Sequence, residues 1–214
     1  MDGAAAQPSA HLQLREHTRA AHDAAEASDG MRALLSGAMD EAGYRALLAA
    51  QLGLFHAWEA ERAAEIAAID DVWAYASRVP CLEDDLTFVG ARLRAMQGRE
   101  NASGPVAPRE KMSRASALLQ GGARGMAVFW GELYVIEGSA LGGQVIVRYL
   151  RERFPGLPHA YYAMGEHAPG RWRTFQGALD AALPDASRQR DAIAGAQGMF
   201  ARFQQTLQDP RCHV

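Results

Sequence analysis

Apolar side chains in this sequence recur at intervals of three and four residues, which is the spacing of one face of an α-helix. One such stripe lies between residues 40 and 69, and a second lies near the C-terminus. No segment alternates apolar and polar residues for long enough to indicate a β-sheet. The spacing therefore predicts an all-α helical bundle. The stripes comprise Tyr44, Leu47, Leu48, Leu52 and Phe55, and Ile193, Ala196, Phe200, Phe203 and Leu207.

Glycine and proline divide the chain into helices and connecting segments. Residues 98–108, with the sequence GRENASGPVAP, have the composition of an exposed loop, and PGLP at 155–158 stops the helix before it. A chain of 214 residues has the size of one domain, 1–214, and we expect residues 1–10 to form a flexible segment. The pattern predicts helices over residues 13–26, 40–69, 82–96 and 126–154, and through the C-terminal stripe.

The charge and cysteine content exclude several classes of protein. Lys and Arg number 22 against 25 Asp and Glu, so the net charge of −3 offers no basic surface for nucleic acid. Cys81 and Cys212 lie far apart without a CxxC motif, which indicates neither a disulfide framework nor a thiolate metal site. No signal peptide and no long apolar run are visible. We expect a cytoplasmic protein that binds neither nucleic acid nor membrane.

The stretch GELYVIEGSALGGQVIVRYL at 131–150 reads as a largely apolar helix that carries Gly138, Gly142 and Gly143 in its middle. Each interior glycine lowers helix stability by about 0.5–1 kcal/mol relative to alanine, so the three together lower it by about 1.5–3 kcal/mol. Their spacing clears one side of the helix, and another group can then approach the backbone. That group is either a second helix packed through small residues or a flat ligand.

A second group of residues shares one face of the helix expected over 13–26. Arg15, Arg19, His22 and Glu26 are spaced by four, three and four residues, so their side chains project together. A neutral histidine binds iron through one ring nitrogen while a carboxylate takes the proton on the other. Arginines on the same face suit the carboxylates of a ligand. The alternative is a solvated helix face with an ordinary surface histidine.

Motifs for other chemistries are absent from the sequence. There is no Glu-x-x-His pair for a di-iron bundle, no CxxCH for covalent haem, no P-loop, no GxGxxG after a strand and no GxSxG. A histidine on one helix and bare backbone on another are the two faces needed to hold a flat disc such as haem. The two features together favour a haem site more strongly than either feature does alone.

Three stretches resemble the haem oxygenase family. LREHTRAAH at 14–22, followed by Glu26, resembles the N-terminal Leu-x-x-x-Thr-x-x-x-His of that family, and LYVIEGSALGGQVI at 133–146 resembles its distal-helix motif. The second likeness is closest in the bacterial branch associated with phytochromes. ASRQRDAIAGAQGMFARFQQTL at 186–207 is similar in pattern to the last helix of the family. The resemblance implies a single-domain helical bundle with haem between a proximal and a kinked distal helix.

The resemblance assigns roles to individual residues. It makes His22 the proximal iron ligand, supported by Glu26, and it makes Gly138 and Gly142 the residues that contact haem on the distal helix, with Gly143 giving the kink its slack. Ser139 stands where many relatives have an aspartate that orders water, so it belongs with Gly138 and Gly142 in the expected catalytic set. The remaining expected haem contacts are Arg15, Arg19 and Arg171 at the propionates, and Phe200 beside the ring.

The resemblance also implies a reaction and its partners. Haem is both substrate and prosthetic group, and O2 with external electrons opens the ring to biliverdin, ferrous iron and carbon monoxide. Because no flavin or nicotinamide motif is visible, a ferredoxin or flavin reductase is the expected electron donor. The likeness to the phytochrome-associated branch implies a bacterial phytochrome as the acceptor of the biliverdin. Two alternatives stay open: a carrier or sensor that binds haem without turnover, and a helical interaction module.

Overall fold

The computed structural model describes residues 9–96, 122–167 and 170–208, and within these ranges the regular structure is entirely helical. The predicted loop at 98–108 and most of the predicted flexible segment at 1–10 lie outside the described residues. The all-α prediction is confirmed. The α-helices are α1 (Ala10–Glu26), α2 (Asp29–Ser36), α3 (Glu41–Glu61), α4 (Ala63–Ala68), α5 (Val79–Met96), α6 (Ala123–Arg153), α7 (Ala160–Ala163), α8 (Arg171–Ala182) and α9 (Ala186–Leu207), and a 3-10 helix, η1, covers Met164–His167.

Aspartate side chains fix where two of the long helices begin. Asp40 accepts a hydrogen bond from the Gly43 backbone N–H at 2.8 Å, and Asp185 accepts one from the Arg188 N–H at 2.9 Å. Each carboxylate satisfies an N–H group that has no partner inside the first turn, which stabilises a helix start by about 1 kcal/mol. The helix predicted over 40–69 therefore starts where expected, but it is divided at Arg62, where φ is −109°.

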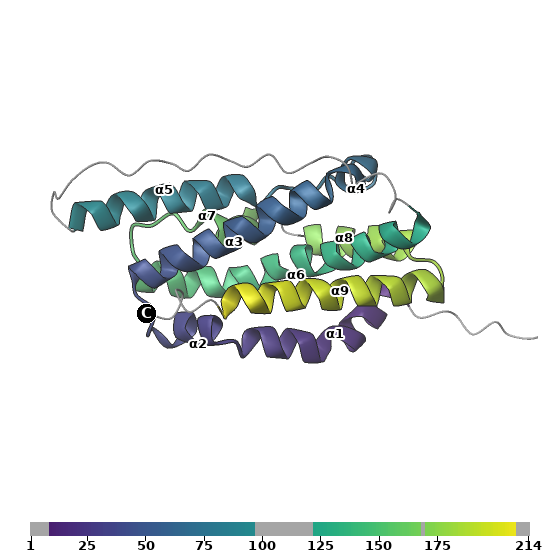
Figure 1. The fold of residues 1–214 in the computed structure, drawn as a ribbon, viewed down its shortest axis with the longest axis horizontal. Helices are drawn as coiled ribbons and strands as arrows, with labels where there is room; N and C mark the ends of the chain where they lie inside the picture. Colours follow the sequence, from purple (N-terminus) through teal and green to yellow (C-terminus); the bar gives the residue numbers. More distant parts are fainter. Residues whose placement is uncertain (1–8, 97–121, 168–169, 209–214) are drawn as a thin grey trace, which may run out of the picture.

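Helix α9 lies between α1 and α6, and α3 and α5 pack together on the other side of α6 (Figure 1). The contact between α6 and α9 is close because glycine stands on both helices. A Cβ atom on Gly131 would overlap the carbonyl of Ala192, and one on Gly195 would overlap the carbonyl of Val128. The two backbones therefore meet directly, and this crossing fixes α9 beside the N-terminal half of α6.

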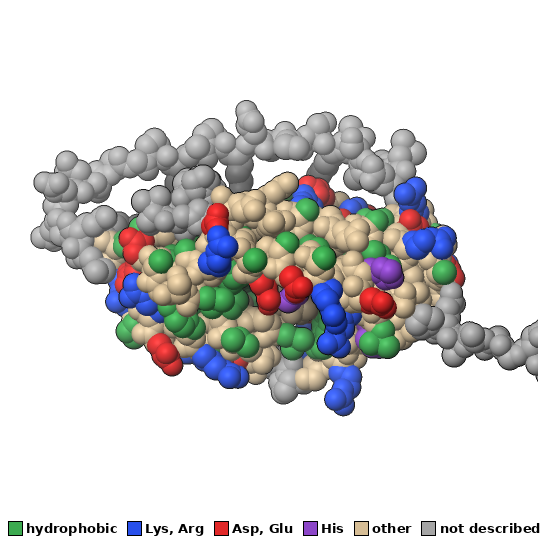
Figure 2. Space-filling view, turned by 90° about the horizontal axis from the view of Figure 1, so that it is seen from below, with side chains coloured by type: hydrophobic (Ala, Val, Ile, Leu, Met, Phe, Trp, Pro, Cys, Tyr) green, Lys and Arg blue, Asp and Glu red, His purple; other side chains and the backbone are tan. Residues whose placement is uncertain are grey.

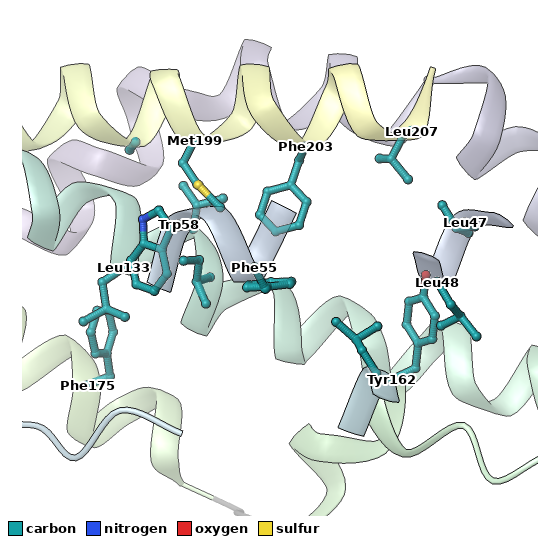
Figure 3. Packing of buried hydrophobic residues seen from close by; sticks show 14 of the residues in the cluster. Leu47, Leu48, Phe55, Trp58, Leu133, Tyr162, Phe175, Met199, Phe203 and Leu207 are labelled. Atoms are coloured by element: carbon teal, nitrogen blue, oxygen red, sulfur yellow. The ribbon is translucent and has the colours of Figure 1, made fainter. Parts of the chain in front are cut away.

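The core forms where the predicted stripes of α3 and α9 meet α6 and α8 (Figure 3). Phe55 and Phe203 contact edge to face with ring centroids 5.9 Å apart, and Trp58 stacks on Phe129 of α6 at 6.0 Å. Each buried aromatic side chain of this kind removes about 150–250 Å² from water. In the predicted stripes, Leu52, Ile193 and Phe200 are only half-buried. In the described part of the chain, no helix is both long enough and apolar enough to cross a membrane.

Candidate active site between α1 and α6

A cavity of about 600 Å³ separates α1 from α6. Its size lies within the range of roughly 300–1,000 Å³ that is usual for ligand and cofactor pockets. Residues of α7, α8 and α9 close its sides. In Figure 2, which views the molecule from the side on which α1 lies, hydrophobic side chains show between acidic and basic ones. The fold thus brings the two helices singled out by sequence to opposite walls of one space.

The wall formed by α1 carries the predicted face of charged and imidazole groups. Arg15, Arg19, His22 and Glu26 all line the cavity. The His22 side chain is 54% exposed; its Nδ1 lies 3.7 Å from an Asp23 oxygen and its Nε2 lies 3.7 Å from Glu26 Oε1. These distances exceed a hydrogen bond, so neither ring nitrogen is committed to a described protein partner. One nitrogen is free for a metal, and a carboxylate is close enough to turn toward the other.

The two arginines of this wall have no described acidic partner. Arg15 and Arg19 are exposed, and no carboxylate in residues 9–96, 122–167 and 170–208 pairs with either of them. Arginine binds carboxylates through two parallel N–H groups. These cations are therefore available to an acidic ligand at the edge of the cavity.

The wall formed by α6 carries the glycines, and their surroundings differ. A Cβ on Gly142 would meet no atom within 4 Å, and one on Gly138 would only touch the ring of Trp172 at 3.4 Å. A Cβ on Gly143 would come within 2.8 Å of the Tyr162 carbonyl oxygen, so this glycine lets the backbone of α7 pack closely. Close packing against α7 therefore accounts for a glycine at this position. The flexibility of the kink that the resemblance assigned to Gly143 is not needed for this, although Gly143 also borders the cavity.

Ser139 reaches the cavity, but its hydroxyl group is engaged. Its Oγ donates to the Ile136 carbonyl oxygen at 2.7 Å, one turn back along α6. The hydroxyl hydrogen is therefore used within the helix, and the oxygen keeps only its capacity to accept.

Arg171 is the one predicted site residue that the structure does not bring to the main cavity. Its guanidinium donates to both oxygens of Glu137 at 3.1 Å and to the Ala74 carbonyl at 2.9 Å, and it stacks over the Trp73 ring at 4.1 Å. These contacts hold the cation on a buried carboxylate on another side of α6. The resemblance implied a propionate contact for Arg171, and nothing local in the sequence indicates the pairing with Glu137, 34 residues earlier.

Sequence reasoning missed several polar and aromatic groups of the cavity. Tyr134 precedes Gly138 by one helical turn and therefore shares its face, which is a signal that spacing alone could have given. Burial raises the pKa of Tyr134, while Arg15 and Thr18 beside it act in the opposite direction. Tyr134 also packs against Trp172 with ring centroids 5.4 Å apart. Gln51, Arg78, Tyr161 and Tyr162 come to the cavity from other elements, and no local pattern predicts them.

The residues present suit a flat, acidic, metal-bearing ligand. The bare backbone at Gly138 and Gly142 forms a surface that a methyl group would roughen, and His22 stands on the opposite wall with a free ring nitrogen. Phe200 packs its edge against His22 at 5.8 Å, so the apolar lining continues to the imidazole. Haem has the matching properties of a planar ring, a metal centre and two carboxylates.

This chain is similar to known heme oxygenases. The family model described as Heme oxygenase matches residues 9–209. A heme oxygenase of Xanthomonas campestris pv. campestris is 43% identical over 137 residues, which cover 63% of this chain and 70% of that protein. In the solved structure of heme oxygenase from Leptospira interrogans, the likeness covers 94% of this chain and 100% of that one, with a TM-score of 0.70 and 18% identity. The likeness to the solved structure of heme oxygenase-1 from Synechocystis in complex with heme covers 94% of this chain and 91% of that one, with a TM-score of 0.63 and 18% identity.

Proposed function

The chain belongs to the haem oxygenase family of haem-degrading enzymes, and from that premise we propose that it opens the haem ring to biliverdin, ferrous iron and carbon monoxide. One observation supports the proposal most directly: His22 on α1 and the bare backbone at Gly138 and Gly142 on α6 line opposite walls of one cavity. Bound haem would supply the iron that activates O2 and the ring that is cleaved. The protein supplies binding, orientation and hydrogen bonds.

His22 is the proposed iron ligand, through whichever ring nitrogen its carboxylate neighbours leave free. Glu26 or Asp23 would accept the proton of the other nitrogen, which fixes the tautomer and raises the basicity of the ligand. Phe200 limits rotation of the ring from the side of α9. These three neighbours orient the imidazole toward the cavity.

Arg15 and Arg19 would hold the propionates, because both cations border the cavity without a described acidic partner. Their positions on one helical face would set the rotation of the ring in its plane. Gly138 and Gly142 would let the backbone of α6 lie close to the other side of the ring, where a side chain would compete with O2. The arginines and the α6 backbone together would then determine which meso carbon of the haem ring is attacked.

The electron donor and the acceptor of the product are further parts of the proposal. The sequence has no flavin or nicotinamide motif, so a ferredoxin or flavin reductase would deliver the electrons. The likeness of the distal motif to the phytochrome-associated branch supports a photoreceptor as the recipient of biliverdin. Such a system would operate in the cytoplasm.

A carrier or sensor that binds haem without turnover is the second candidate, because the Ser139 hydroxyl already donates to Ile136. Hemin titration followed by a ferredoxin–reductase system in air distinguishes the candidates. Conversion of the Soret band into the broad red absorption of biliverdin, with carbon monoxide trapped by reduced myoglobin, supports the enzyme. A stable Soret band under the same conditions supports the carrier, and no Soret band contradicts both.

A further inference from the structure

Arg78 is a buried cation beside the α6 wall of the cavity, and nothing in the motifs of α1 or α6 points to it. Its side chain is only 4% exposed and lines the main cavity, and also a second, smaller cavity of about 190 Å³. The two spaces share Ala140, Leu141, Met164 and Trp172 as further lining residues, so Arg78 stands where they adjoin. A charged group in such a place is rare unless it is paired or has a function.

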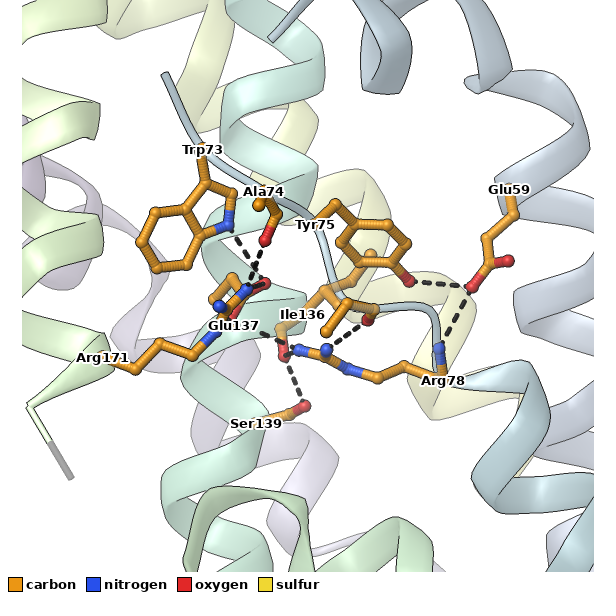
Figure 4. A network of polar contacts seen from close by, with 10 residues as sticks. Glu59, Trp73, Ala74, Tyr75, Arg78, Ile136, Glu137, Ser139 and Arg171 are labelled. Carbon is orange, nitrogen blue, oxygen red and sulfur yellow. Dashed lines mark hydrogen bonds and ion pairs between the residues drawn. The ribbon is translucent and has the colours of Figure 1, made fainter. Parts of the chain in front are cut away.

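Three elements hold Arg78 in position (Figure 4). Its backbone N–H donates to Glu59 of α3 at 3.2 Å, and its guanidinium lies 5.5 Å from the centre of the Tyr75 ring. On α6, one terminal nitrogen lies 3.4 Å from the Ile136 carbonyl oxygen and 3.4 Å from a Glu137 oxygen. The other terminal nitrogen donates to the Ala76 carbonyl at 2.6 Å. The guanidinium is therefore fixed in place against α6.

These contacts leave part of the guanidinium uncommitted. Arginine has five N–H donors, and Ala76, Ile136 and Glu137 account for three of them among the described residues. The side chain is almost fully buried and lines both cavities, so water or a small ligand in them is the partner open to the remaining donors. The smaller cavity is also polar, with Glu137, Gln144 and Arg171 in its lining, and its volume accommodates several water molecules at about 30 Å³ each.

Ser139 and Arg78 meet at the same acceptor. The Ser139 hydroxyl donates to Ile136 at 2.7 Å, and the Arg78 guanidinium approaches the same carbonyl oxygen at 3.4 Å (Figure 4). Serine at this position has used its only hydrogen, whereas the arginine beside it retains donors and a permanent positive charge. On the α6 side of the cavity, Ser139 therefore offers an acceptor and Arg78 offers donors.

We propose that Arg78, which Glu137 holds in place, supplies hydrogen-bond donors and positive charge to a small ligand bound between haem and α6. Ser139 cannot supply either. The inference rests on the proposed function, since it requires haem between His22 and α6. It assigns Glu137 the task of orienting the guanidinium, and it assigns Arg171 the task of neutralising Glu137 from outside the main cavity.

Azide binding to the ferric haem complex tests this without any turnover, because azide is an anion that senses distal donors and charge. Arg78→Gln should weaken azide binding by about tenfold or more, as expected for the loss of a charge-assisted hydrogen bond. Arg78→Lys keeps the charge and should lose less. Arg62→Gln is the matched control, since Arg62 pairs with another α6 carboxylate, Glu132 at 2.7 Å, but lines neither cavity, and its azide affinity should stay near that of the wild type.

Arg78→Gln also lowers the formal charge of the cluster formed by Arg78, Glu137 and Arg171 from +1 to 0, whereas the double variant Arg78→Gln/Glu137→Gln keeps it at +1 with Arg171 as the cation. It should show the same loss of azide affinity. The proposal is overturned if Arg78→Gln and the double variant both bind azide as the wild type does, or if Arg62→Gln weakens azide as much as Arg78→Gln. A wild-type complex whose spectrum lacks histidine ligation would instead contradict the proposed function.

Discussion

The imidazole of His22 meets the ring of Phe200 edge to face, with the ring centroids 5.8 Å apart and the planes at 77°. Phe200 belongs to α9, which packs against α1, so a second helix restricts the ring that α1 carries. Asp23 and Glu26 lie 3.7 Å from its two nitrogens. Phe200 of α9 and the carboxylates of Asp23 and Glu26 therefore surround the His22 imidazole, the candidate iron ligand.

His22→Ala should abolish the spectrum of histidine-ligated haem while leaving the fold intact. The side chain is 54% exposed and has no hydrogen bond to a described residue, so its loss should change the stability of the haem-free protein by less than about 0.5 kcal/mol. Absorption and EPR spectra of the hemin complex, with urea unfolding of the haem-free protein, measure the two effects. His17→Ala on the same helix is the control, because His17 is exposed but does not line the cavity. An unaltered spectrum with full turnover in His22→Ala would exclude this ligand.

The parts of the site that sequence predicted are those encoded within single helices. The face with Arg15 and His22 and the cleared side of α6 at Gly138 and Gly142 follow from intervals of three to five residues, which the helix geometry converts directly into proximity. The fold class followed from the same periodicity.

The contributions that sequence did not predict come from contacts between distant elements. Arg78 lies in the segment before α5 and contacts Ile136 of α6, 58 residues later in the sequence. Arg171 of α8 contacts Glu137 of α6. No short sequence pattern predicts either contact, because each depends on how α6, α8 and the segment before α5 pack against one another. Arg62, where the predicted helix is divided, likewise pairs with a distant residue, Glu132 of α6, at 2.7 Å.

Arg15→Ala should alter how haem is seated more than how tightly it binds. An exposed ion pair contributes about 0–1 kcal/mol, whereas the apolar contact of a flat ring supplies much of the binding. The haem methyl resonances in the NMR spectrum of the ferric complex report the seating, and chromatography of the biliverdin isomers reports the position of attack. Arg190→Ala removes an exposed cation that does not line the cavity and should change neither. If Arg15→Ala matches that control in both measurements, Arg15 is a solvated cation without a role in haem orientation.

His159 should make the stability of the protein depend on pH. It is 1% exposed, accepts or donates at 3.0 Å with Tyr44, and contacts the Phe154 carbonyl at 3.2 Å. Burial lowers the pKa of His159, the Phe154 carbonyl opposes this shift and Arg151 reinforces it. Below the unfolded pKa of about 6.5 the unfolded chain therefore binds more protons, and the free energy of unfolding falls as the pH falls through that value.

His159→Asn tests this contribution, because asparagine tolerates the positive φ of 53° at this position and does not titrate. The variant will differ from the wild type in absolute stability, so the informative quantity is the difference between urea unfolding free energies at pH 7.5 and 5.5. That difference should be smaller in His159→Asn than in the wild type. His17→Asn, which removes an exposed histidine, should preserve it. An unchanged difference in His159→Asn would show that other groups cause the pH dependence.

Gly142→Ala and Gly143→Ala should act in opposite directions although the residues are adjacent. A methyl group at Gly142 meets no atom within 4 Å, so alanine should stabilise the haem-free protein by about 0.5–1 kcal/mol through helix propensity. The same group at Gly143 falls 2.8 Å from the Tyr162 carbonyl oxygen and should destabilise it by about 1–3 kcal/mol. In the haem complex, however, the methyl at Gly142 should stand where the ring and O2 belong, and biliverdin formation per bound haem should fall. Urea unfolding and single-turnover absorption measure the two quantities on the same samples. A Gly142→Ala protein that is less stable yet turns over normally would mean that this glycine serves helix packing and not the ligand.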